Sequence, residues 1–600
     1  MQLRDFAAAS SLVSLFLDRV DEFGDAPLLS VKRGGTWQAQ SWNEVARRVC
    51  LLAERLRALG LSTGDRVVIV SENRPAWFIA DFAIMAAGGV TTSAYTTNTV
   101  ADHAHVLADS GARTVIVSTR KLAATMVDAI RLGGAVEHLI VIEPFDAPGD
   151  LPVAVHRWDD LLQGDGAVAR LSVERRMAEV SRDDLACIIY TSGTGGTPRG
   201  VMLHHGAILA NVESAATALV HDLGPGPHRF LSFLPLSHAF EHTAGQMLPQ
   251  AVGAEIWYAE GLEKLASNIA EAQPTLMVVV PRLFEILRAR IIKQVAKEGR
   301  VARFLLEQAV ALAERKAAGR SRFGDRLLTA MLERTLRPKI RARFGGRLMA
   351  MVSGGAPLNP EVGRFFEALG LTILQGYGQT EAGPIISCNY PSAGIRMETV
   401  GPPLQGVEVR VAEDGELLVR GELVMKGYWN NPEDTAKTLE GGWLHTGDIG
   451  RFDEAGRIII TDRKKDMIIN DKGDNIAPQK VEGRLTSQPE IGQAMIYGDK
   501  QPHVVALIVP DADWAADWAA KNGEPADLSA LAHLPAFRAP IRQTIDRVNE
   551  GLSVIEKVRS FAFANEPFSI ENGELTPSLK IRRHAIRARY GERLESLYAR

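Results

Sequence analysis

Short apolar runs rich in Val and Ile alternate with helical patterns along the first part of the chain. The runs lie at 66–70, 114–117 and 139–142, and a helix is predicted from about Ala76 to Ala87. Strands that alternate with helices at this spacing are typical of parallel βαβ units. The pattern returns at 275–280. The sequence therefore predicts an α/β fold whose main part is built from parallel layers.

Two later stretches have different patterns. Residues 282–344 have a helical pattern, and residues 291–345 contain 14 Lys and Arg against 5 Asp and Glu. We interpret this basic helical segment, about 282–345, either as a solvated helix face or as a surface attracted to phosphate groups or an anionic membrane. From about Val400, short alternating runs at 407–411 and 416–420 predict antiparallel sheet.

A domain boundary is predicted at the charge cluster Thr461–Asp466, which follows an apolar run at 457–460. Its composition is that of a surface linker. Division at this point gives an N-terminal domain of residues 1–461 and a C-terminal domain of residues 462–600, the second of which has an ordinary domain size.

Composition and charge narrow the classes of function. A chain of 600 residues with 46% hydrophobic content can bury a large core, and a net charge of −4 argues against a dedicated nucleic-acid binder. Cys50, Cys187 and Cys388 lack the spacing of a zinc site or a disulfide framework, which favours a cytosolic protein. The N-terminus has no signal-peptide core, and no run reaches the ~18 apolar residues of a membrane span. Any membrane contact is therefore expected to be peripheral.

The segment Ile189–Val201 concentrates hydroxyl residues, glycines and one cation after an apolar strand. Glycines allow backbone N–H groups to approach phosphate oxygens, hydroxyls donate further hydrogen bonds, and Arg199 supplies positive charge. It is not a Walker A loop, because the Gly-Lys-Ser/Thr ending is missing. Composition alone also fits a linker.

Further clusters suit a nucleotide. Glycines at 354 and 355 allow a flat group to lie against the backbone. Tyr377 is suited to stacking on a purine, Thr380 to bonding a phosphate and Glu381 to holding Mg²⁺. Each has an ordinary alternative, since Tyr377 also fits a core position and Glu381 a solvated loop.

Two carboxyl and cationic positions follow later in the chain. Asp448 comes after a tight turn and is suited to accepting hydrogen bonds from ribose hydroxyls, and Arg463 is suited to pairing with the same sugar or its phosphate. Lys580 precedes a basic helix, where a surface lysine is the default interpretation.

In this order and at these separations, the segments resemble the adenylate-forming superfamily of acyl-CoA synthetases, adenylation domains and luciferases, over about residues 40–590. The resemblance implies a large N-terminal domain of parallel βαβ layers with a small β-barrel-like part, followed by a smaller, mobile α+β C-terminal domain. It also implies a hinge at Asp462, catalytic roles for Lys580, Thr191, Glu381 and His238, and Mg²⁺ binding by Glu381 and Thr191. The implied nucleotide-binding positions are Thr191, Ser192, Gly193, Thr194, Gly195, Gly196, Arg199, Gly354, Gly355, Ala356, Gln375, Gly376, Tyr377, Gly378, Thr380, Asp448, Ile460, Arg463 and Lys580.

Two positions depart from the usual phosphate loop of this superfamily. Gly195 stands where threonine is common, so one hydroxyl donor is missing and a pyrophosphate contact is expected to be weaker. Arg199 stands where lysine is usual, which preserves the charge but not the compact ammonium geometry.

The basic helical insertion resembles that of bacterial long-chain fatty acyl-CoA synthetases. The expected reaction is ATP-dependent activation of a long-chain fatty acid to acyl-AMP, with Mg²⁺, and transfer to coenzyme A. The expected location is cytoplasmic, with peripheral contact at the inner membrane face and no nucleic-acid partner. The alternatives are a fatty acyl-AMP ligase that serves a carrier protein, a ligase for another carboxylic acid, and a catalytically silent nucleotide-binding protein.

Overall fold

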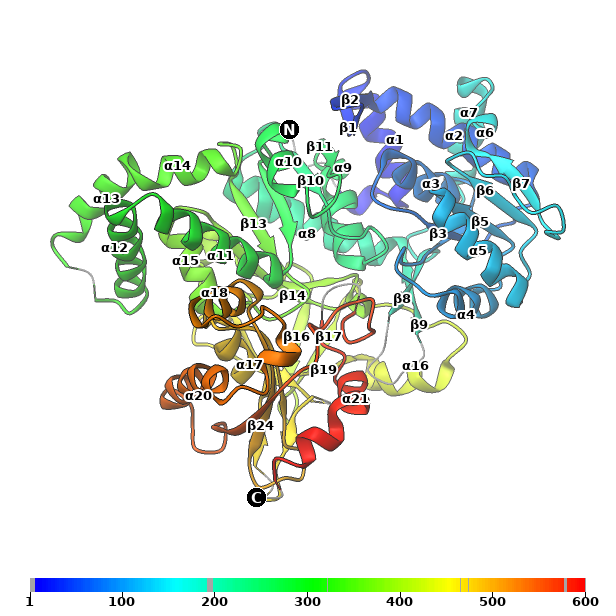
Figure 1. Ribbon diagram of the computed structural model, residues 1–600. Helices are drawn as coiled ribbons and strands as arrows, with labels where there is room; N and C mark the ends of the chain where they lie inside the picture. The colour runs from blue at the N-terminus through cyan, green and yellow to red at the C-terminus, as the bar shows by residue number, and fades with distance from the viewer. Residues whose placement is uncertain are drawn as a thin grey trace.

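The computed structural model describes residues 6–191, 198–320, 322–464, 466–472, 474–576 and 580–598. Figure 1 shows the first elements at the upper right, a group of helices at the upper left and the C-terminal elements below. In the described ranges, no helix combines the length and apolar character needed to cross a membrane.

The first large sheet contains the Val- and Ile-rich runs. Its eight strands follow the order β18-β9-β8-β4-β3-β5-β6-β7. β3 pairs in parallel with β4 and β5, and β5 pairs in parallel with β6, so the predicted parallel units are confirmed. These strands and their helices are β3 (Arg66–Val70), α3 (Pro75–Ala86), β4 (Val90–Ser93), α4 (Val100–Ser110), β5 (Thr114–Val117), α5 (Arg120–Leu132), β6 (His138–Val141), β7 (Ala154–Arg157), α6 (Trp158–Leu161), α7 (Gly166–Met177), β8 (Leu185–Thr191), β9 (Arg199–His204) and β18 (Gly427–Tyr428).

The second large sheet also has eight strands, in the order β15-β14-β13-β12-β10-β11-β1-β2. Its centre is parallel, whereas β15 and β2 pair antiparallel at the two edges. The predicted strand at 275–280 is β12, and the two glycine-containing segments of the predicted site adjoin β13 and β14. The strands are β1 (Pro27–Arg33), β2 (Thr36–Ser41), β10 (Arg229–Ser232), β11 (Glu255–Tyr258), β12 (Leu276–Val279), β13 (Ala350–Ser353), β14 (Ile373–Gly378) and β15 (Ile385–Cys388).

The main hydrophobic core lies where helices pack on these sheets. Phe16, Trp42, Phe78 and Leu209 are fully buried in one cluster that joins four helices. A π-helix, η2, runs directly into α9 and lies at the edge of this core. The helices are η1 (Phe6–Ala8), α1 (Leu12–Phe23), α2 (Trp42–Ala58), α8 (His205–Leu223), η2 (Glu241–Met247), α9 (Leu248–Ala251) and α10 (Leu265–Ala272).

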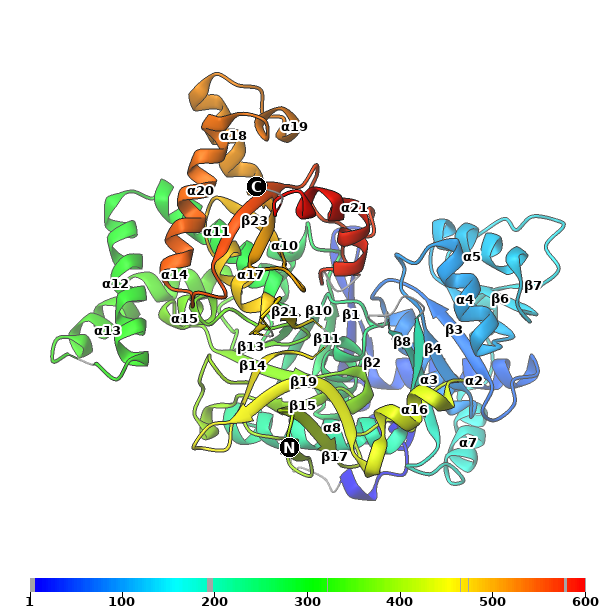
Figure 2. The same ribbon diagram turned by 90° about the horizontal axis from the view of Figure 1, so that it is seen from below.

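The basic segment consists of helices, in agreement with its helical pattern. α11 and α12 contact α15, and Leu306, Leu332 and Ile340 share one hydrophobic cluster with Phe365 and Phe366. Figures 1 and 2 both place α12 and α13 at the outer left edge of the molecule. The helices are α11 (Pro281–Lys297), α12 (Arg300–Ala317), α13 (Asp325–Arg334), α14 (Leu336–Arg343) and α15 (Pro360–Ala368).

The antiparallel region predicted from about residue 400 is an open four-stranded sheet, β16 (Glu408–Val411), β17 (Glu416–Arg420), β19 (Leu444–Phe452) and β20 (Ile458–Arg463). In the described ranges β16 and β20 are the two edge strands, so the part expected to be barrel-like is an open sheet. Short elements around it are η3 (Thr380–Ala382), η4 (Pro391–Ala393), α16 (Pro432–Thr438) and η5 (Glu440–Gly442).

The surface linker predicted at Thr461–Asp466 is wrong in its first half. β20 continues through Arg463, and Asp462 is only 3% exposed. The reason is strand pairing, since Asp462 lies opposite Ile449 and Arg463 opposite Asp448 in the β19–β20 register.

The C-terminal part is a smaller α+β unit with its own hydrophobic clusters. Its three-stranded sheet follows the order β23-β24-β25, and a two-stranded ribbon precedes it. The elements are β21 (Ile468–Ile469), β22 (Asn475–Ile476), α17 (Pro478–Thr486), β23 (Ile491–Tyr497), β24 (Val504–Pro510), α18 (Ala512–Asn522), α19 (Leu528–Leu531), α20 (Pro535–Glu550), β25 (Val558–Phe563) and α21 (Arg583–Glu595).

The C-terminal unit contacts the first helix of the basic segment. Arg282 donates to the Gly492 carbonyl at 3.2 Å, and the Lys293 ammonium pairs with Asp513 at 2.7 Å. Asn359, which caps α15, donates to the Gly483 carbonyl at 2.9 Å. The inner part of the basic segment is therefore a docking surface within the protein, which neither interpretation of its charge had predicted.

Candidate active site

All of the predicted site residues that the structure describes line one cavity of about 2390 Å³. Sites for a single small molecule occupy roughly 300–1,000 Å³, so this cavity has room for more than one substrate. Ser192, Gly193, Thr194, Gly195 and Gly196 of the predicted phosphate loop lie outside the described residues. The predicted residues on the cavity wall are Thr191, Arg199, His238, Gly354, Gly355, Ala356, Gln375, Gly376, Tyr377, Gly378, Thr380, Glu381, Asp448, Ile460, Arg463 and Lys580.

Two glycines allow close backbone approach on the wall formed by β13 and β14. A Cβ at Gly354 would lie 2.7 Å from the Phe240 ring, and a Cβ at Gly378 would lie 1.9 Å from the Pro384 carbonyl oxygen. Both distances are shorter than van der Waals contact, so a larger residue would displace the wall. Glycine at these positions keeps the strand ends flat against the cavity.

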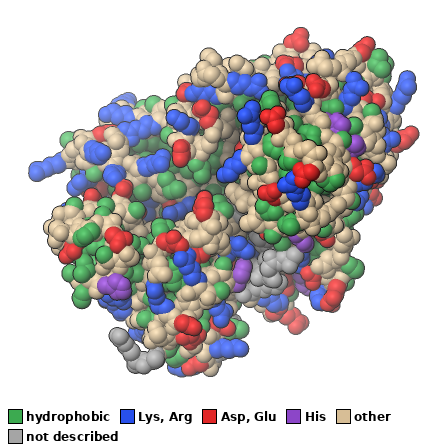
Figure 3. Space-filling model, turned by 45° about the vertical axis from the view of Figure 1, so that its right-hand side comes forward, with side chains coloured by type: hydrophobic (Ala, Val, Ile, Leu, Met, Phe, Trp, Pro, Cys, Tyr) green, Lys and Arg blue, Asp and Glu red, His purple; other side chains and the backbone are tan. Residues whose placement is uncertain are grey.

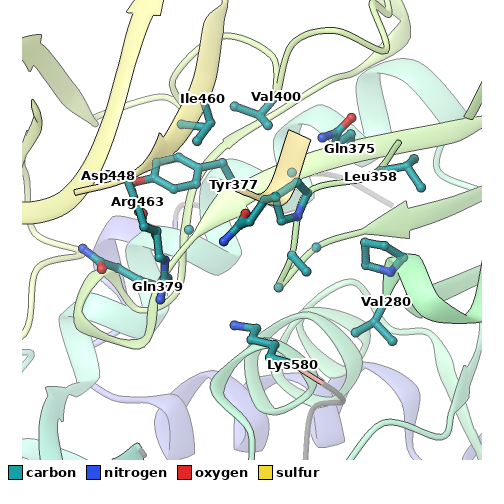
Figure 4. A pocket seen from close by; sticks show the side chains of 18 of the residues that line it. Val280, Leu358, Gln375, Tyr377, Gln379, Val400, Asp448, Ile460, Arg463 and Lys580 are labelled. Atoms are coloured by element: carbon teal, nitrogen blue, oxygen red, sulfur yellow. Dashed lines mark hydrogen bonds and ion pairs between the residues drawn. The ribbon is translucent and has the colours of Figure 1, made fainter. Parts of the chain in front are cut away.

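Tyr377, Asp448 and Arg463 form a linked group on the opposite side of the cavity from Lys580 (Figure 4). The Tyr377 hydroxyl donates to Asp448 Oδ2 at 2.7 Å, and Arg463 Nε donates to Asp448 Oδ1 at 3.1 Å. Burial raises the pKa of the Asp448 carboxyl, and the Arg463 charge opposes that shift. The carboxylate is thus held in one orientation by two donors, one from β14 and one from β20.

Lys580 points into the cavity from the C-terminal unit (Figure 4). Its backbone is fixed by Thr576, whose hydroxyl accepts from the Lys580 N–H at 3.0 Å. Burial lowers the pKa of the Lys580 ammonium to about 8, the Arg463 charge acts in the same direction, and Asp448 and Glu381 oppose it. Near pH 7 the side chain therefore carries a poorly hydrated positive charge, which interacts strongly with any anion nearby.

The phosphate-loop hairpin is formed by β8 and β9, with Thr191 opposite Arg199 in the register. The Arg199 guanidinium lies 4.2 Å from the centre of the Tyr428 ring and donates to Asp434 at 2.9 Å. In this structure the charge of Arg199 is therefore directed at another side chain of the protein, although the residue borders the cavity.

Glu381 lies in the short helix η3, and its Oε1 accepts a 2.8 Å hydrogen bond from the Tyr428 hydroxyl. No group of three or more His, Cys, Asp or Glu side chains in the described ranges is arranged to hold a metal ion. Mg²⁺ is usually bound by one or two carboxylates together with substrate phosphates. The donors available here, the Glu381 carboxylate and the Thr191 hydroxyl, fit that mode of binding.

An apolar channel continues the cavity along α8. Ala215, Ala218, Leu219, Asp222 and Leu223 line it at helical spacing, so a single face of α8 forms the wall. The far end carries the Asp222 carboxylate, which accepts hydrogen bonds from the Ser392 N–H at 3.2 Å and hydroxyl at 3.1 Å. Phe230, Leu276, Leu374 and Cys388 add further lining to the same cavity.

His238 stands where the apolar channel meets the polar part of the cavity. Burial lowers the pKa of its imidazole to about 3, and the Lys580 charge adds to this shift. Its Nδ1 accepts from the Phe240 N–H at 3.2 Å. The ring is therefore neutral at pH 7, so it presents hydrogen-bonding groups and shape, not charge, to the cavity.

Sequence reasoning missed Tyr428 and the channel face of α8. Tyr428 contacts Glu381 across 47 residues of chain, and nothing in its local sequence signals that contact. The α8 face had a detectable signal, because Ala215, Ala218, Leu219 and Leu223 recur at helical spacing. The same spacing is typical of an ordinary core helix.

Comparison with family models gives two matches that together span most of the chain. The model described as AMP-binding enzyme matches residues 16–429, and the model described as AMP-binding enzyme C-terminal domain matches residues 465–600.

Relatives of similar length were also found. The chain is 35% identical over 570 residues to the long-chain-fatty-acid–CoA ligase FadD15 of Mycobacterium tuberculosis, covering 94% of this chain and 93% of that protein. It is 31% identical over 637 residues to the peroxisomal long chain acyl-CoA synthetase 7 of Arabidopsis thaliana, covering 99% and 87%. The adenylation domain of a carboxylate reductase from Mycobacterium chelonae superposes with a TM-score of 0.76 at 22% identity, covering 100% of this chain and 92% of that one, which shows a shared fold.

Proposed function

Because the chain belongs to the AMP-binding enzyme family, we propose that it activates long-chain fatty acids with ATP and transfers the acyl group to coenzyme A, releasing AMP and pyrophosphate. The observation that carries this proposal is the single cavity in which Lys580, Asp448 and Glu381 meet the apolar channel along α8. The polar part suits a nucleotide and the channel suits a hydrocarbon chain, so a carboxylate would sit where the two parts join, beside His238.

In the first half-reaction, the fatty acid carboxylate attacks the α-phosphate of ATP and pyrophosphate leaves. The acid is already ionised at neutral pH, so no general base is needed. Negative charge spreads over the phosphate oxygens in the transition state, and the poorly hydrated Lys580 ammonium stabilises it. Asp448, fixed by Tyr377 and Arg463, accepts hydrogen bonds from the ribose hydroxyls.

Mg²⁺ held by Glu381 and Thr191 would offset the charge of the phosphate groups. The adenine ring would lie against the backbone after β13, where Gly354, Gly355 and Ala356 leave a flat space in the cavity wall.

In the second half-reaction, the C-terminal unit would turn about Asp462, withdraw Lys580 and admit the coenzyme A thiol to the acyl-adenylate carbonyl. The contacts of the C-terminal unit with α11 and α15 support such a movement, because they are a few hydrogen bonds and one exposed ion pair. If Lys580 acts only in the first half-reaction, its position on the C-terminal unit allows rotation of that unit to remove it before the second.

The test is a screen of pyrophosphate release over carboxylic acids of increasing length, with and without coenzyme A. Release that depends on long acids and is accelerated by coenzyme A supports the proposal. Turnover that requires a carrier protein instead would indicate an acyl-AMP ligase, and a preference for short or aromatic acids would indicate another substrate class. No release with any acid would indicate a silent nucleotide-binding protein.

We also propose a cytoplasmic enzyme that makes peripheral contact with an anionic membrane through α13 and the loop before it. Phe323, Leu327 and Met331 are exposed there beside the exposed cations Arg322 and Arg326. Lys and Arg side chains gather on the left of the face in Figure 3, the side on which Figure 1 places α12 to α14. Sedimentation with anionic vesicles at low but not high salt would support this contact, and equal sedimentation with neutral vesicles would contradict it.

A further inference from the structure

Glu381 is held by a side chain that comes from a distant part of the sequence. The Tyr428 hydroxyl donates to Glu381 Oε1 at 2.8 Å, and the tyrosine is 4% exposed. Strand pairing fixes its backbone, since Tyr428 of β18 lies opposite Val201 of β9. Its N–H also donates to the Thr435 hydroxyl at 2.9 Å. The hydroxyl therefore meets the carboxylate from a rigid position.

Arg199 restrains the aromatic ring of the same tyrosine. Its guanidinium lies 4.2 Å from the Tyr428 ring centre and donates to Asp434 Oδ2 at 2.9 Å. Asp434 is oriented in turn by Asn431, whose amide donates to the same oxygen at 3.1 Å. A continuous chain of contacts thus links α16, the phosphate-loop hairpin, β18 and η3.

We propose that Tyr428 is a positioning residue for Glu381 and that Arg199 holds Tyr428 in place instead of binding phosphate. The proposal rests on the proposed function, in which Glu381 is a ligand of the nucleotide-bound metal. Carboxylates that bind a metal are usually oriented by a hydrogen bond from a second residue. The planar guanidinium can lie on a ring and donate to Asp434 at once, which the compact ammonium of lysine does poorly. The exchange of the usual lysine for Arg199 then has a structural reason.

The experiment measures ATP binding by calorimetry over a series of Mg²⁺ concentrations, using the full-length protein. Tyr428→Phe removes the hydroxyl and keeps the ring, so the Mg²⁺ concentration for half-maximal binding should rise about tenfold, as is typical when such a partner is lost. Tyr590→Phe is the matched control, because Tyr590 is 2% exposed and its hydroxyl accepts from the Asn565 N–H in the C-terminal unit. That control should leave the Mg²⁺ dependence unchanged.

A double-variant cycle separates positioning from general stability. In a Glu381→Gln background, Tyr428→Phe should no longer shift the Mg²⁺ dependence, because the tyrosine acts through the carboxylate. The thermal midpoint of the protein without ligand is recorded for each variant. An unchanged Mg²⁺ dependence in Tyr428→Phe, or the same shift with and without Glu381, would overturn the proposal.

Arg199→Gln gives a second, independent test. It removes the charge that lies on the Tyr428 ring and pairs with Asp434, so it should raise the Mg²⁺ requirement in the same direction and leave ATP affinity at saturating Mg²⁺ unchanged. Weaker ATP binding at saturating Mg²⁺ would instead place Arg199 on the phosphates and refute its structural role. Failure of the proposed function can be distinguished from failure of this proposal. In the first case the unaltered protein would release no pyrophosphate with fatty acids, whatever the effect of Tyr428→Phe on Mg²⁺-dependent ATP binding.

Discussion

Filling the channel along α8 should shorten the fatty acids that the protein accepts. Ala218 lines the channel, and Leu223 lies near its far end on the same helix face. At ~1.5 Å of rise per residue, the helix advances about 7.5 Å between these two positions. An extended chain advances roughly 1.2 Å per bond, so Ala218→Trp should remove room for about six carbons.

The size of the effect follows from burial. About six methylenes at ~0.8 kcal/mol each give roughly 5 kcal/mol, so kcat/KM for the longest acids should fall more than about a thousandfold. The assay is pyrophosphate release over a series of acid lengths. Thr217→Trp is the control, because the neighbouring side chain is directed away from the channel and bonds to the Glu213 carbonyl. An unchanged length profile for Ala218→Trp would show that the acyl chain does not run along α8.

Three further predictions concern ionisable groups. Lys580→Ala should raise the activation free energy of adenylate formation by about 3 kcal/mol, the usual effect of removing one preorganised charge, and spare thioester formation from supplied acyl-adenylate. Equal loss in both half-reactions would show that the lysine has a structural role. Because the pKa of Lys580 is lowered to about 8, its charge is lost as pH rises through that value, so the adenylation rate should fall above about pH 8, and a flat profile there would contradict the role. Burial raises the pKa of Glu241 to about 8, so folding favours its protonated form, and its contribution to stability declines as pH rises from about 4.5 to 8. Over this window the thermal midpoint of Glu241→Gln should therefore rise relative to that of the unaltered protein. Parallel curves of thermal midpoint against pH would show that Glu241 does not titrate there.

The parallel layers could be predicted from sequence because their strands are buried on both faces and are therefore apolar throughout. β3 and β5 are of this kind, and each was found within a residue of its predicted bounds. The antiparallel sheet was found from its alternation. The end of β20 was misjudged, because Asp462 and Arg463 are charged yet paired within the sheet.

The site was less accessible to sequence reasoning. Asp448 and Arg463 adjoin each other through strand register, and Lys580 faces them across the cavity from another unit, so only the resemblance to a known superfamily grouped them. The guanidinium of Arg199 is directed by its contacts with Tyr428 and Asp434, which lie more than 200 residues away in sequence. Residue types along the chain carry no information about such a contact.

The docking of the C-terminal unit on α11 has a consequence for how fast a complete cycle can run. Surface ion pairs such as Lys293–Asp513 contribute only ~0–1 kcal/mol and are screened by salt, and single hydrogen bonds contribute about as little. Because salt screens the ion pair, ionic strength is expected to shift the population between this orientation and the one proposed for the second half-reaction. Moderate salt would then alter which half-reaction limits turnover without changing any group that touches a substrate.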